Sequence, residues 1–258
     1  MPLEIVTVPC RSDNYAYLLR DGASGKVALV DAPEERPIME ALEARGWELD
    51  AIWITHHHGD HVEAVEPLRT RFGAAVVGHG ADAARLPRLD TAVGEGDTVS
   101  LGETAARVLD VSGHTVGHIA FVVDETGAGP AAFTADSLMA LGCGRVFEGT
   151  HAMMWESLCK LNALPAETRI YSGHNYGKAN GRFALSIEPE NAELLARIER
   201  IAVADGEGAP IVPATLAEER ATNPFLRAVE PGVKAALGLD GADDAAVFGE
   251  IRRRKDSF

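Results

Sequence analysis

The chain has 258 residues, enough for one large domain or two smaller ones. Hydrophobic residues make up 46% and charged residues 24%, which is the balance of a globular protein and excludes a disordered one. The net charge of −15 disfavours nucleic acid as a partner, because an acidic surface repels phosphate groups. No apolar run approaches the roughly 20 residues that a membrane span requires, so no membrane association is expected.

The cysteines and the N-terminus indicate a cytoplasmic protein. Cys10, Cys143 and Cys159 are sparse and odd in number, which argues against a disulfide framework. The first residues place no basic segment ahead of an apolar run, so a signal peptide is not expected. A monomer is the default expectation.

Short strands interleaved with helices are predicted in the first part of the chain. Residues 3–8, 15–19 and 27–30 are β-type runs separated by Asp, Asn and Gly. A helix is expected over residues 37–45, with a proline in its first turn and a glycine after its end. The pattern indicates a layered α/β fold. Further strands are expected at 51–54, 74–77, 105–111, 118–123, 131–133 and 169–171.

The pattern becomes helical after residue 176. Residues 190–204 carry apolar side chains at helical spacing, and the Gly- and Pro-rich residues 205–213 are typical of a loop. We therefore predict a domain of residues 1–175 followed by a small helical domain of residues 176–258. Its other helices are expected at 214–220, 231–237 and 243–253.

A histidine cluster carries the strongest chemical signal. The sequence THHHGDH, residues 55–61, directly follows the apolar strand expected at 51–54. Imidazole and carboxylate groups on a rigid support are the usual ligands of catalytic metals. His56 and His58 can turn toward one ion, and Asp60 and His61 can face a second ion nearby. A surface turn that is rich in histidine is the competing interpretation, and the spacing favours metal binding.

Three more candidate ligands each follow an expected strand. His114, Asp136 and His174 would separately be turn or cap residues more often than ligands. Together with the first cluster they supply the groups that a two-metal site still lacks.

These residues resemble the ligand set of the metallo-β-lactamase superfamily, whose fold is an αβ/βα sandwich with the metals at one edge. The resemblance implies that His56, His58 and His114 hold one metal. It implies that Asp60, His61 and His174 hold the other, with Asp136 bridging both. The remaining histidines match no ligand position, and for His118 we expect a supporting role. The histidines that match no ligand position are His57, His79, His118 and His151.

Finer features resemble the hydroxyacylglutathione hydrolase (glyoxalase II) family along the whole chain. The segment 136–149, DSLMALGCGRVFEG, resembles the family's passage from the bridging Asp to a Gly-Cys-Gly loop. TNPFLR at 222–227 and RRRKDSF at 252–258 resemble features of its helical domain. DNY at 13–15 and IEPEN at 187–191 fit as well.

The resemblance implies a substrate and the residues that bind it. The substrate would be S-D-lactoylglutathione or a related S-(2-hydroxyacyl)glutathione, hydrolysed to glutathione and D-lactate or a related acid in the second step of methylglyoxal detoxification. Without the resemblance, the basic run 252–255 would be interpreted as a solvated helix end. With it, the carboxylates of glutathione would give Arg252 and Lys255 a role in substrate binding. Two departures are Phe147, where the family often has Tyr, and Asn175, where it usually has Glu. The residues implied in substrate binding are Arg145, Phe147, His174, Tyr176, Arg252 and Lys255.

The expected chemistry is attack by a hydroxide that bridges two divalent metals, most readily zinc, with iron or manganese as alternatives. Asp60 is expected to orient the hydroxide as well as to bind metal. The thiolate leaving group needs no protein acid, because its conjugate acid has a pKa of about 8.5. A nucleophilic role for Cys143 is the weaker idea, since no base is assigned to it.

Three readings compete with the hydrolase. A persulfide dioxygenase or a lactonase would share the superfamily fold, and a non-catalytic glutathione- or metal-binding module belongs to another class. Metal content separates them: about two equivalents for the hydrolase, one for a mononuclear dioxygenase and none for a dead site.

Overall fold

The computed structural model describes residues 2–258 and divides the chain into two compact units. The first unit comprises Met1–Asp110 and Val116–Ala135, and the second comprises Val111–Thr115 and Asp136–Phe258.

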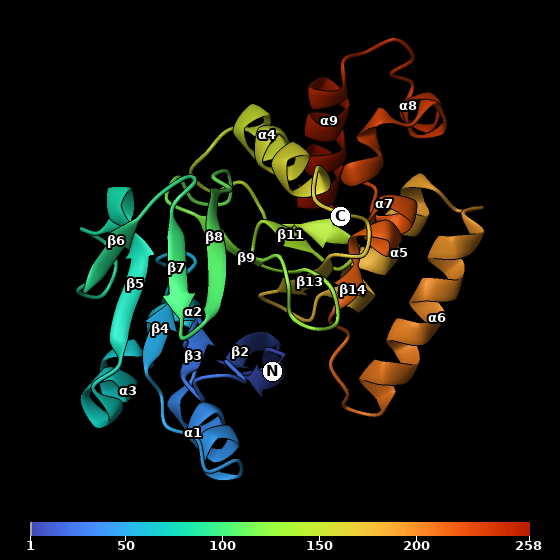
Figure 1. Ribbon diagram of the computed structural model, residues 1–258. Coiled ribbons are helices and arrows are strands. Elements are labelled where there is room, and N and C mark those ends of the chain that lie inside the picture. Colours follow the sequence, from blue (N-terminus) through green and yellow to red (C-terminus); the bar gives the residue numbers. More distant parts are fainter. Residues whose placement is uncertain (1) are drawn as a thin grey trace. The chain divides into compact units, whose positions relative to one another are not determined.

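A six-stranded sheet forms one layer of the first unit (Figure 1). Its first three strands are antiparallel, whereas the last three join by parallel pairing. Parallel neighbours need crossover connections, and α1 (Glu35–Glu43) and α3 (Val65–Phe72) lie in two of them. In spatial order the strands are β1 (Glu4–Cys10), β2 (Asn14–Arg20), β3 (Val27–Val30), β4 (Ala51–Trp53), β5 (Ala75–His79) and β6 (Thr91–Val93).

The core on the helical face of this sheet is aliphatic. Ile38 and Leu42 from α1 and Leu68 from α3 are fully buried in one cluster with Leu29 and Ile52 of the sheet. The α1 helix confirms the helix expected over residues 37–45, but it begins and ends two residues earlier.

A second, antiparallel layer completes the first unit. Its strands lie in the order β10 (Ala131–Ala135), β9 (Ile119–Val123), β8 (Thr104–Asp110) and β7 (Thr98–Leu101). Trp53 contacts Phe121 with ring centroids 5.2 Å apart, and Tyr17 contacts Phe133 at 5.5 Å, so aromatic rings join the two layers. β6 and β7 were not expected, because segments of three and four residues carry little periodic signal.

The second unit is mainly helical. Two short pairs of strands, β11 (Leu138–Met139) with β12 (Gly142–Cys143) and β13 (Arg169–Ser172) with β14 (Ala214–Thr215), accompany the helices. The helices are α4 (His151–Asn162), α5 (Gly177–Ile187), α6 (Ala192–Gly206), α7 (Leu216–Thr222), α8 (Pro231–Leu237) and α9 (Asp244–Asp256), with a 3-10 turn at Leu226–Val229.

The helices expected near 190–204, 231–237 and 243–253 are confirmed, whereas α5 was missed. Glycine weakens helix propensity, and α5 contains Gly177 and Gly181. A Cβ atom at Gly177 would lie 2.5 Å from Ile211, and one at Gly181 would lie 2.9 Å from Ile198 of α6. Close packing against neighbouring segments therefore explains the glycines and outweighs their poor propensity.

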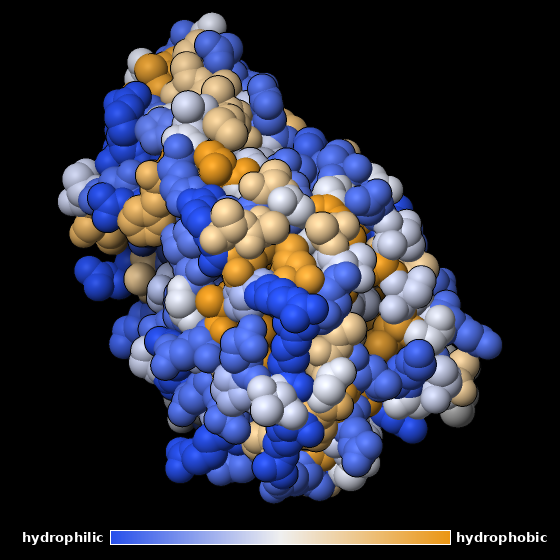
Figure 2. All heavy atoms as spheres, turned by 90° about the vertical axis from the view of Figure 1, so that its left-hand side faces the viewer, coloured by the Kyte–Doolittle hydropathy of each residue, from blue (hydrophilic) through white to orange (hydrophobic). Residues whose placement is uncertain are grey.

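Polar and apolar side chains are interspersed on the face shown in Figure 2, as on an ordinary protein surface. Among residues 2–258, no helix combines the length and the apolar character that a membrane crossing needs.

Candidate active site

In the first unit, the histidine cluster lies at the carboxyl end of β4. Thr55 to His58 form the loop after this strand, and the short helix α2 (Gly59–Val62) carries Asp60 and His61. The Nε2 atom of His56 lies 3.2 Å from Nδ1 of His58, and the rings of His56 and His61 have centroids 4.2 Å apart. Oδ2 of Asp60 lies 3.8 Å from Nε2 of His61. The structure thus brings four predicted ligands of the first unit into one cluster.

Asp31, which the sequence analysis missed, orients two of these imidazoles. His61 Nδ1 donates to Asp31 Oδ2 at 2.8 Å. Thr55 Oγ1 donates to the same oxygen at 2.8 Å and lies 3.0 Å from His56 Nδ1, whose proton it accepts. Both Nδ1 atoms then carry hydrogen, which leaves both Nε2 lone pairs available to a metal. The signal available in the sequence was an Asp directly after an apolar strand. In the structure Asp31 adopts a left-handed φ of 57°.

The histidines that match no ligand position have other contacts. His57 Nδ1 lies 3.1 Å from Asp82 Oδ2. The other carboxylate oxygen of Asp82 accepts a hydrogen bond from Arg85. His118 is fully buried and stacks on His56 with centroids 4.5 Å apart. This stacking fits the supporting role expected for His118. His79 Nδ1 lies 3.3 Å from the Gly117 carbonyl oxygen. His151, the first residue of α4, lies edge-on to Phe248.

In the second unit, one carboxylate lies between two imidazoles. Asp136 Oδ2 is 3.4 Å from His114 Nε2 and 3.3 Å from His174 Nε2, and all three residues are buried. His114 Nδ1 donates to the Arg145 carbonyl oxygen at 2.7 Å, so its Nε2 lone pair faces the carboxylate. A Cβ atom at Gly144 would lie 1.9 Å from the Asp136 carbonyl oxygen, so only glycine fits beside this cluster.

The donor set of each unit fits divalent metal ions. Imidazole nitrogens with available lone pairs, together with carboxylate oxygens, are the ligands that zinc and related metals accept. In each cluster one imidazole, His61 in the first and His114 in the second, has its tautomer fixed by a hydrogen bond from the opposite ring nitrogen, which is the usual arrangement around a metal-binding histidine.

The candidate substrate-binding residues all belong to the second unit. Phe147 is 61% exposed, and its ring lies 5.3 Å from that of His114 and 5.6 Å from the Arg145 guanidinium. Tyr176 stacks on His174 with centroids 4.7 Å apart and planes within 8°. These exposed side chains border the imidazoles and offer an aromatic and cationic surface to a ligand.

Arg252 and Lys255 on α9 lie in unequal surroundings. Arg252 is buried, donates to the Cys143 carbonyl oxygen at 3.0 Å and pairs with Asp256 at 2.9 Å. Lys255 donates to the Ala179 carbonyl oxygen at 3.1 Å, and partial burial, aided by the nearby cation of Arg252, lowers the pKa of its ammonium group. Arg252 therefore also holds the Cys143 loop, whereas Lys255 has the more accessible charge. The neighbouring arginines of the basic run, Arg253 and Arg254, pair with Glu250.

Cys143 has the properties of a packing residue. Burial raises the pKa of its thiol to about 11, although the Arg252 cation acts in the opposite direction. A thiol in this state is protonated at neutral pH and is a poor nucleophile.

Comparisons with known proteins agree with this geometry. The family model described as "Metallo-beta-lactamase superfamily" matches residues 11–174, and the model "Hydroxyacylglutathione hydrolase C-terminus" matches residues 175–258. Among solved structures, a crystal structure of ETHE1 from Myxococcus xanthus is similar, with a TM-score of 0.66 and 25% identity, covering 100% of this chain and 99% of that one. The BLEG-1 B3 metallo-beta-lactamase, at 20% identity and a TM-score of 0.65, covers 86% of this chain and 99% of its own, and it supports the fold alone. The expected sandwich with a C-terminal helical region is thus confirmed.

Curated relatives match from end to end. A protein of Ruegeria pomeroyi named "Hydroxyacylglutathione hydrolase" is 60% identical over 258 residues, which is 100% of both chains. A protein of Cereibacter sphaeroides with the same name is also 60% identical over the same coverage, and one of Roseobacter denitrificans is 52% identical. At this identity and coverage, the chain belongs to the hydroxyacylglutathione hydrolase family of the metallo-β-lactamase superfamily, a family of metal-dependent hydrolases.

Proposed function

We propose that this protein hydrolyses S-(2-hydroxyacyl)glutathione thioesters, with S-D-lactoylglutathione as the representative substrate, to glutathione and a 2-hydroxy acid. The observation that carries the proposal is the 60% identity over the full length of relatives named hydroxyacylglutathione hydrolase. The product from the representative substrate is D-lactate.

The proposed site holds two divalent ions, most readily zinc, with iron or manganese as alternatives. The first-unit cluster would contribute four ligands and the second-unit cluster three. Both clusters contain imidazoles whose tautomers are already fixed for metal binding, which supports the proposal. The full set is His56, His58, Asp60, His61, His114, Asp136 and His174.

The proposed chemistry divides between the ions and the chain. Bound divalent cations lower the pKa of water and stabilise negative charge on a carbonyl oxygen. Asp60, next to His61, would orient the attacking water through a carboxylate oxygen. No protein acid is needed for departure of the thiol, because a thiolate with a conjugate-acid pKa of about 8.5 leaves readily.

Recognition of the glutathione part is proposed for the second unit. Arg145, Arg252 and Lys255 supply positive charge for carboxylates in a protein whose net charge is −15. Phe147, His174 and Tyr176 supply the aromatic surface beside the second-unit imidazoles. Phe147 lacks the hydroxyl of the usual Tyr, so one polar contact is absent there.

We also propose a catalytic domain of residues 1–175 and a glutathione-binding helical domain of residues 176–258. The two family models, which meet between residues 174 and 175, support this boundary. We propose further that the enzyme is a cytoplasmic monomer that binds neither nucleic acid nor membrane.

The test is hydrolysis of S-D-lactoylglutathione by the purified protein, before and after metal removal with a chelator, together with elemental analysis. We expect release of glutathione, loss of activity on chelation, recovery with Zn²⁺, and about two metal equivalents per chain. One metal equivalent would favour a dioxygenase, and absence of turnover with two equivalents would favour another ester-like substrate, such as a lactone. Absence of metal would leave a non-catalytic module.

A further inference from the structure

Asn14 contacts one of the proposed ligands with both hydrogens of its side-chain amide. Its Nδ2 atom donates to Asp60 Oδ2 at 3.0 Å and to the Asp60 carbonyl oxygen at 3.1 Å. Asn14 is 4% exposed, so water competes little for these bonds. The two bonds connect the side chain and the backbone of Asp60 to the same atom, Asn14 Nδ2, and so restrict rotation of the carboxylate.

Asn14 is itself held at a fixed place in the sheet. It is the first residue of β2 and is the register partner of Cys10, the last residue of β1. The intervening tight turn begins at Arg11, which adopts a left-handed φ of 50°. A non-glycine residue in this region is uncommon and persists where surrounding contacts stabilise it.

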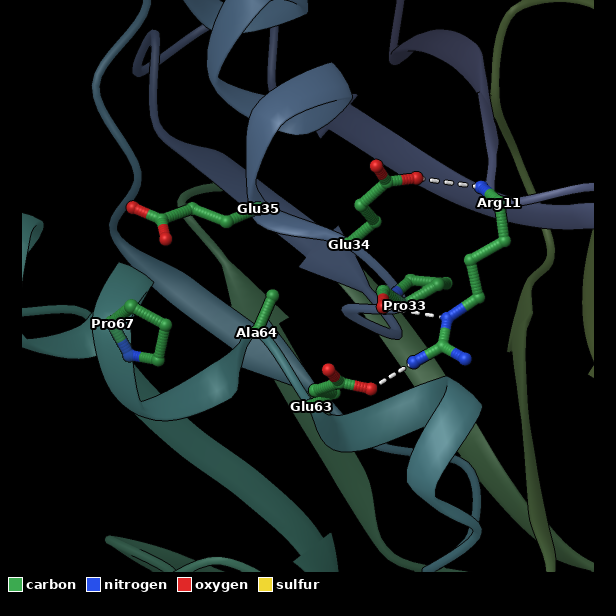
Figure 3. Close-up of a pocket in the computed structure, with 7 residues that line it drawn as sticks. All are labelled: Arg11, Pro33, Glu34, Glu35, Glu63, Ala64 and Pro67. Atoms are coloured by element: carbon green, nitrogen blue, oxygen red, sulfur yellow. Dashed lines mark hydrogen bonds and ion pairs between the residues drawn. The ribbon is translucent and has the colours of Figure 1, made fainter.

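Figure 3 shows the contacts that stabilise this turn. The Arg11 backbone N–H donates to Glu34 Oε2 at 2.7 Å, and its Nε donates to the Pro33 carbonyl oxygen at 3.0 Å. Its guanidinium also pairs with Glu63, the residue that follows α2. The turn is therefore tied both to the segment after β3 and to the end of the helix that carries Asp60.

Asparagine suits this position for a chemical reason. An uncharged amide donates two hydrogens to an ionised carboxylate and its carbonyl, whereas Asp at position 14 would place a second negative charge about 3 Å from the first. Alanine would remove both donors from Asp60, whose side chain is only partly exposed, and would leave its carboxylate oxygen and carbonyl without these hydrogen bonds.

We propose that Asn14 is a positioning residue for Asp60, which fixes the carboxylate in the orientation that binds metal. This inference rests on the metal site of the proposed function. Groups that hydrogen-bond to metal ligands typically contribute 10- to 100-fold in metal affinity or activity.

The experiment compares Asn14→Ala and Asn14→Ser with the wild-type chain. Serine keeps the buried position polar, but its hydroxyl is one bond shorter than the amide and does not make both contacts. The matched control is Asn191→Ala, which removes an amide that donates to the Ala221 carbonyl oxygen and caps α6. Affinity for Zn²⁺ alone is measured by competition with a chromogenic chelator on metal-free protein, alongside the melting temperature of each metal-free variant. Values of kcat and KM for S-D-lactoylglutathione are then measured with saturating Zn²⁺.

We expect both Asn14 variants to weaken the lower-affinity Zn²⁺ equivalent by about tenfold or more. We expect kcat to fall while KM stays within twofold, because the amide of Asn14 donates to Asp60 rather than to a candidate substrate-binding residue. Asn191→Ala should lose a similar amount of thermal stability and keep its Zn²⁺ affinity. Unchanged Zn²⁺ affinity in a folded Asn14→Ser protein, or an equal loss in Asn191→Ala, would overturn the proposal. The Zn²⁺ measurement uses no thioester, so it tests the role of Asn14 even if the protein does not hydrolyse the substrate.

Discussion

Two buried aspartates illustrate how position decides what a carboxylate does. Asp31 accepts hydrogen bonds from His61 and Thr55, so its oxygens orient the imidazoles. Asp136 places one oxygen within 3.4 Å of the Nε2 atoms of both His114 and His174, on the side from which an imidazole binds metal. Replacement of either residue should therefore affect metal binding, by different routes.

The bridging role proposed for Asp136 gives a direct prediction. Asp136→Ala should lose metal and thioesterase activity together, because the two ions would lose the carboxylate that they are proposed to share. Elemental analysis and activity on the same sample provide the measurement. Asp124→Ala, which removes an exposed partner of Arg107, should retain both. A variant at position 136 that is fully metallated and active would exclude the bridging role.

The two cations on α9 should respond differently to substitution. Lys255→Ala should raise KM by about tenfold or more with little change in kcat, since a charge-assisted hydrogen bond contributes about 1.5–3 kcal/mol. Arg252→Ala should raise KM and also lower the melting temperature, because it removes contacts with Cys143 and Asp256. Steady-state kinetics and thermal unfolding distinguish the two.

Arg253→Ala is the control for that comparison, because Arg253 lies on the same helix and pairs with Glu250. Its KM should remain at the wild-type value. If Lys255→Ala behaved in the same way, the charge at position 255 would have no role in substrate binding.

Residue types that bind metal could be predicted from the sequence, whereas the residues that support them could not. The segment from His56 to His61 stands out by spacing alone, because few other functions place four imidazoles and a carboxylate within six residues. Asp31 follows β3 and Asn14 begins β2, and their partners lie 30 and 46 positions away. Only the fold reveals such pairings.

At the level of elements, a buried ion pair connects α6 and α7 to the β11–β12 hairpin. Glu219 is fully buried, pairs with Arg197 and accepts from the Leu141 N–H at 3.1 Å. Asn223, from the TNPFLR sequence, donates to the carbonyl oxygens of Met139 and Gly142 at 3.2 and 2.9 Å. This sequence therefore has an architectural role in supporting the hairpin.

Glu219→Gln should lower the free energy of unfolding by about 3 kcal/mol, because Arg197 would remain buried without its counter-charge. Urea unfolding monitored by circular dichroism measures the change. Glu199→Gln, at an exposed position of α6, should differ from wild type by less than about 0.5 kcal/mol. Equal midpoints for the two variants would contradict a stabilising role for the buried pair.

Elements with clear periodicity could be predicted, and those specified by tertiary contacts could not. The helix near residues 190–204 was evident from its apolar spacing, and α6 confirms it. The α5 helix, which contains two glycines, and the very short strands β6 and β7 carry no such signal. Their neighbours, rather than their own sequences, determine these structures.

For the whole molecule, acid stability should depend on carboxylates with lowered pKa values. Hydrogen bonds from Ser24 chiefly lower the pKa of Asp21, with a further contribution from Thr104. A carboxyl group whose folded-state pKa is depressed adds stability above its unfolded pKa of about 3.9, and this stability is lost as the pH falls through the folded value.

Asp21→Asn should therefore be less stable than wild type at pH 7, and the difference should shrink as the pH is lowered below about 4. Urea unfolding at pH 7 and at pH 3 measures the difference. Asp240→Asn, at an exposed position, should show little difference at either pH. A gap between wild type and Asp21→Asn that stayed constant from pH 7 to pH 3 would contradict the lowered pKa.

The unequal burial of the candidate substrate-binding residues has a consequence for divergence within the family. Arg145 and Phe147 are exposed, so mutations there cost little stability and leave many variants viable. Arg252 supports the Cys143 loop, and its loss removes part of the scaffold. A lineage, or a directed-evolution campaign, that moves toward a different thiol carrier should therefore accumulate its first changes at positions 145 and 147, with position 252 changing late or not at all.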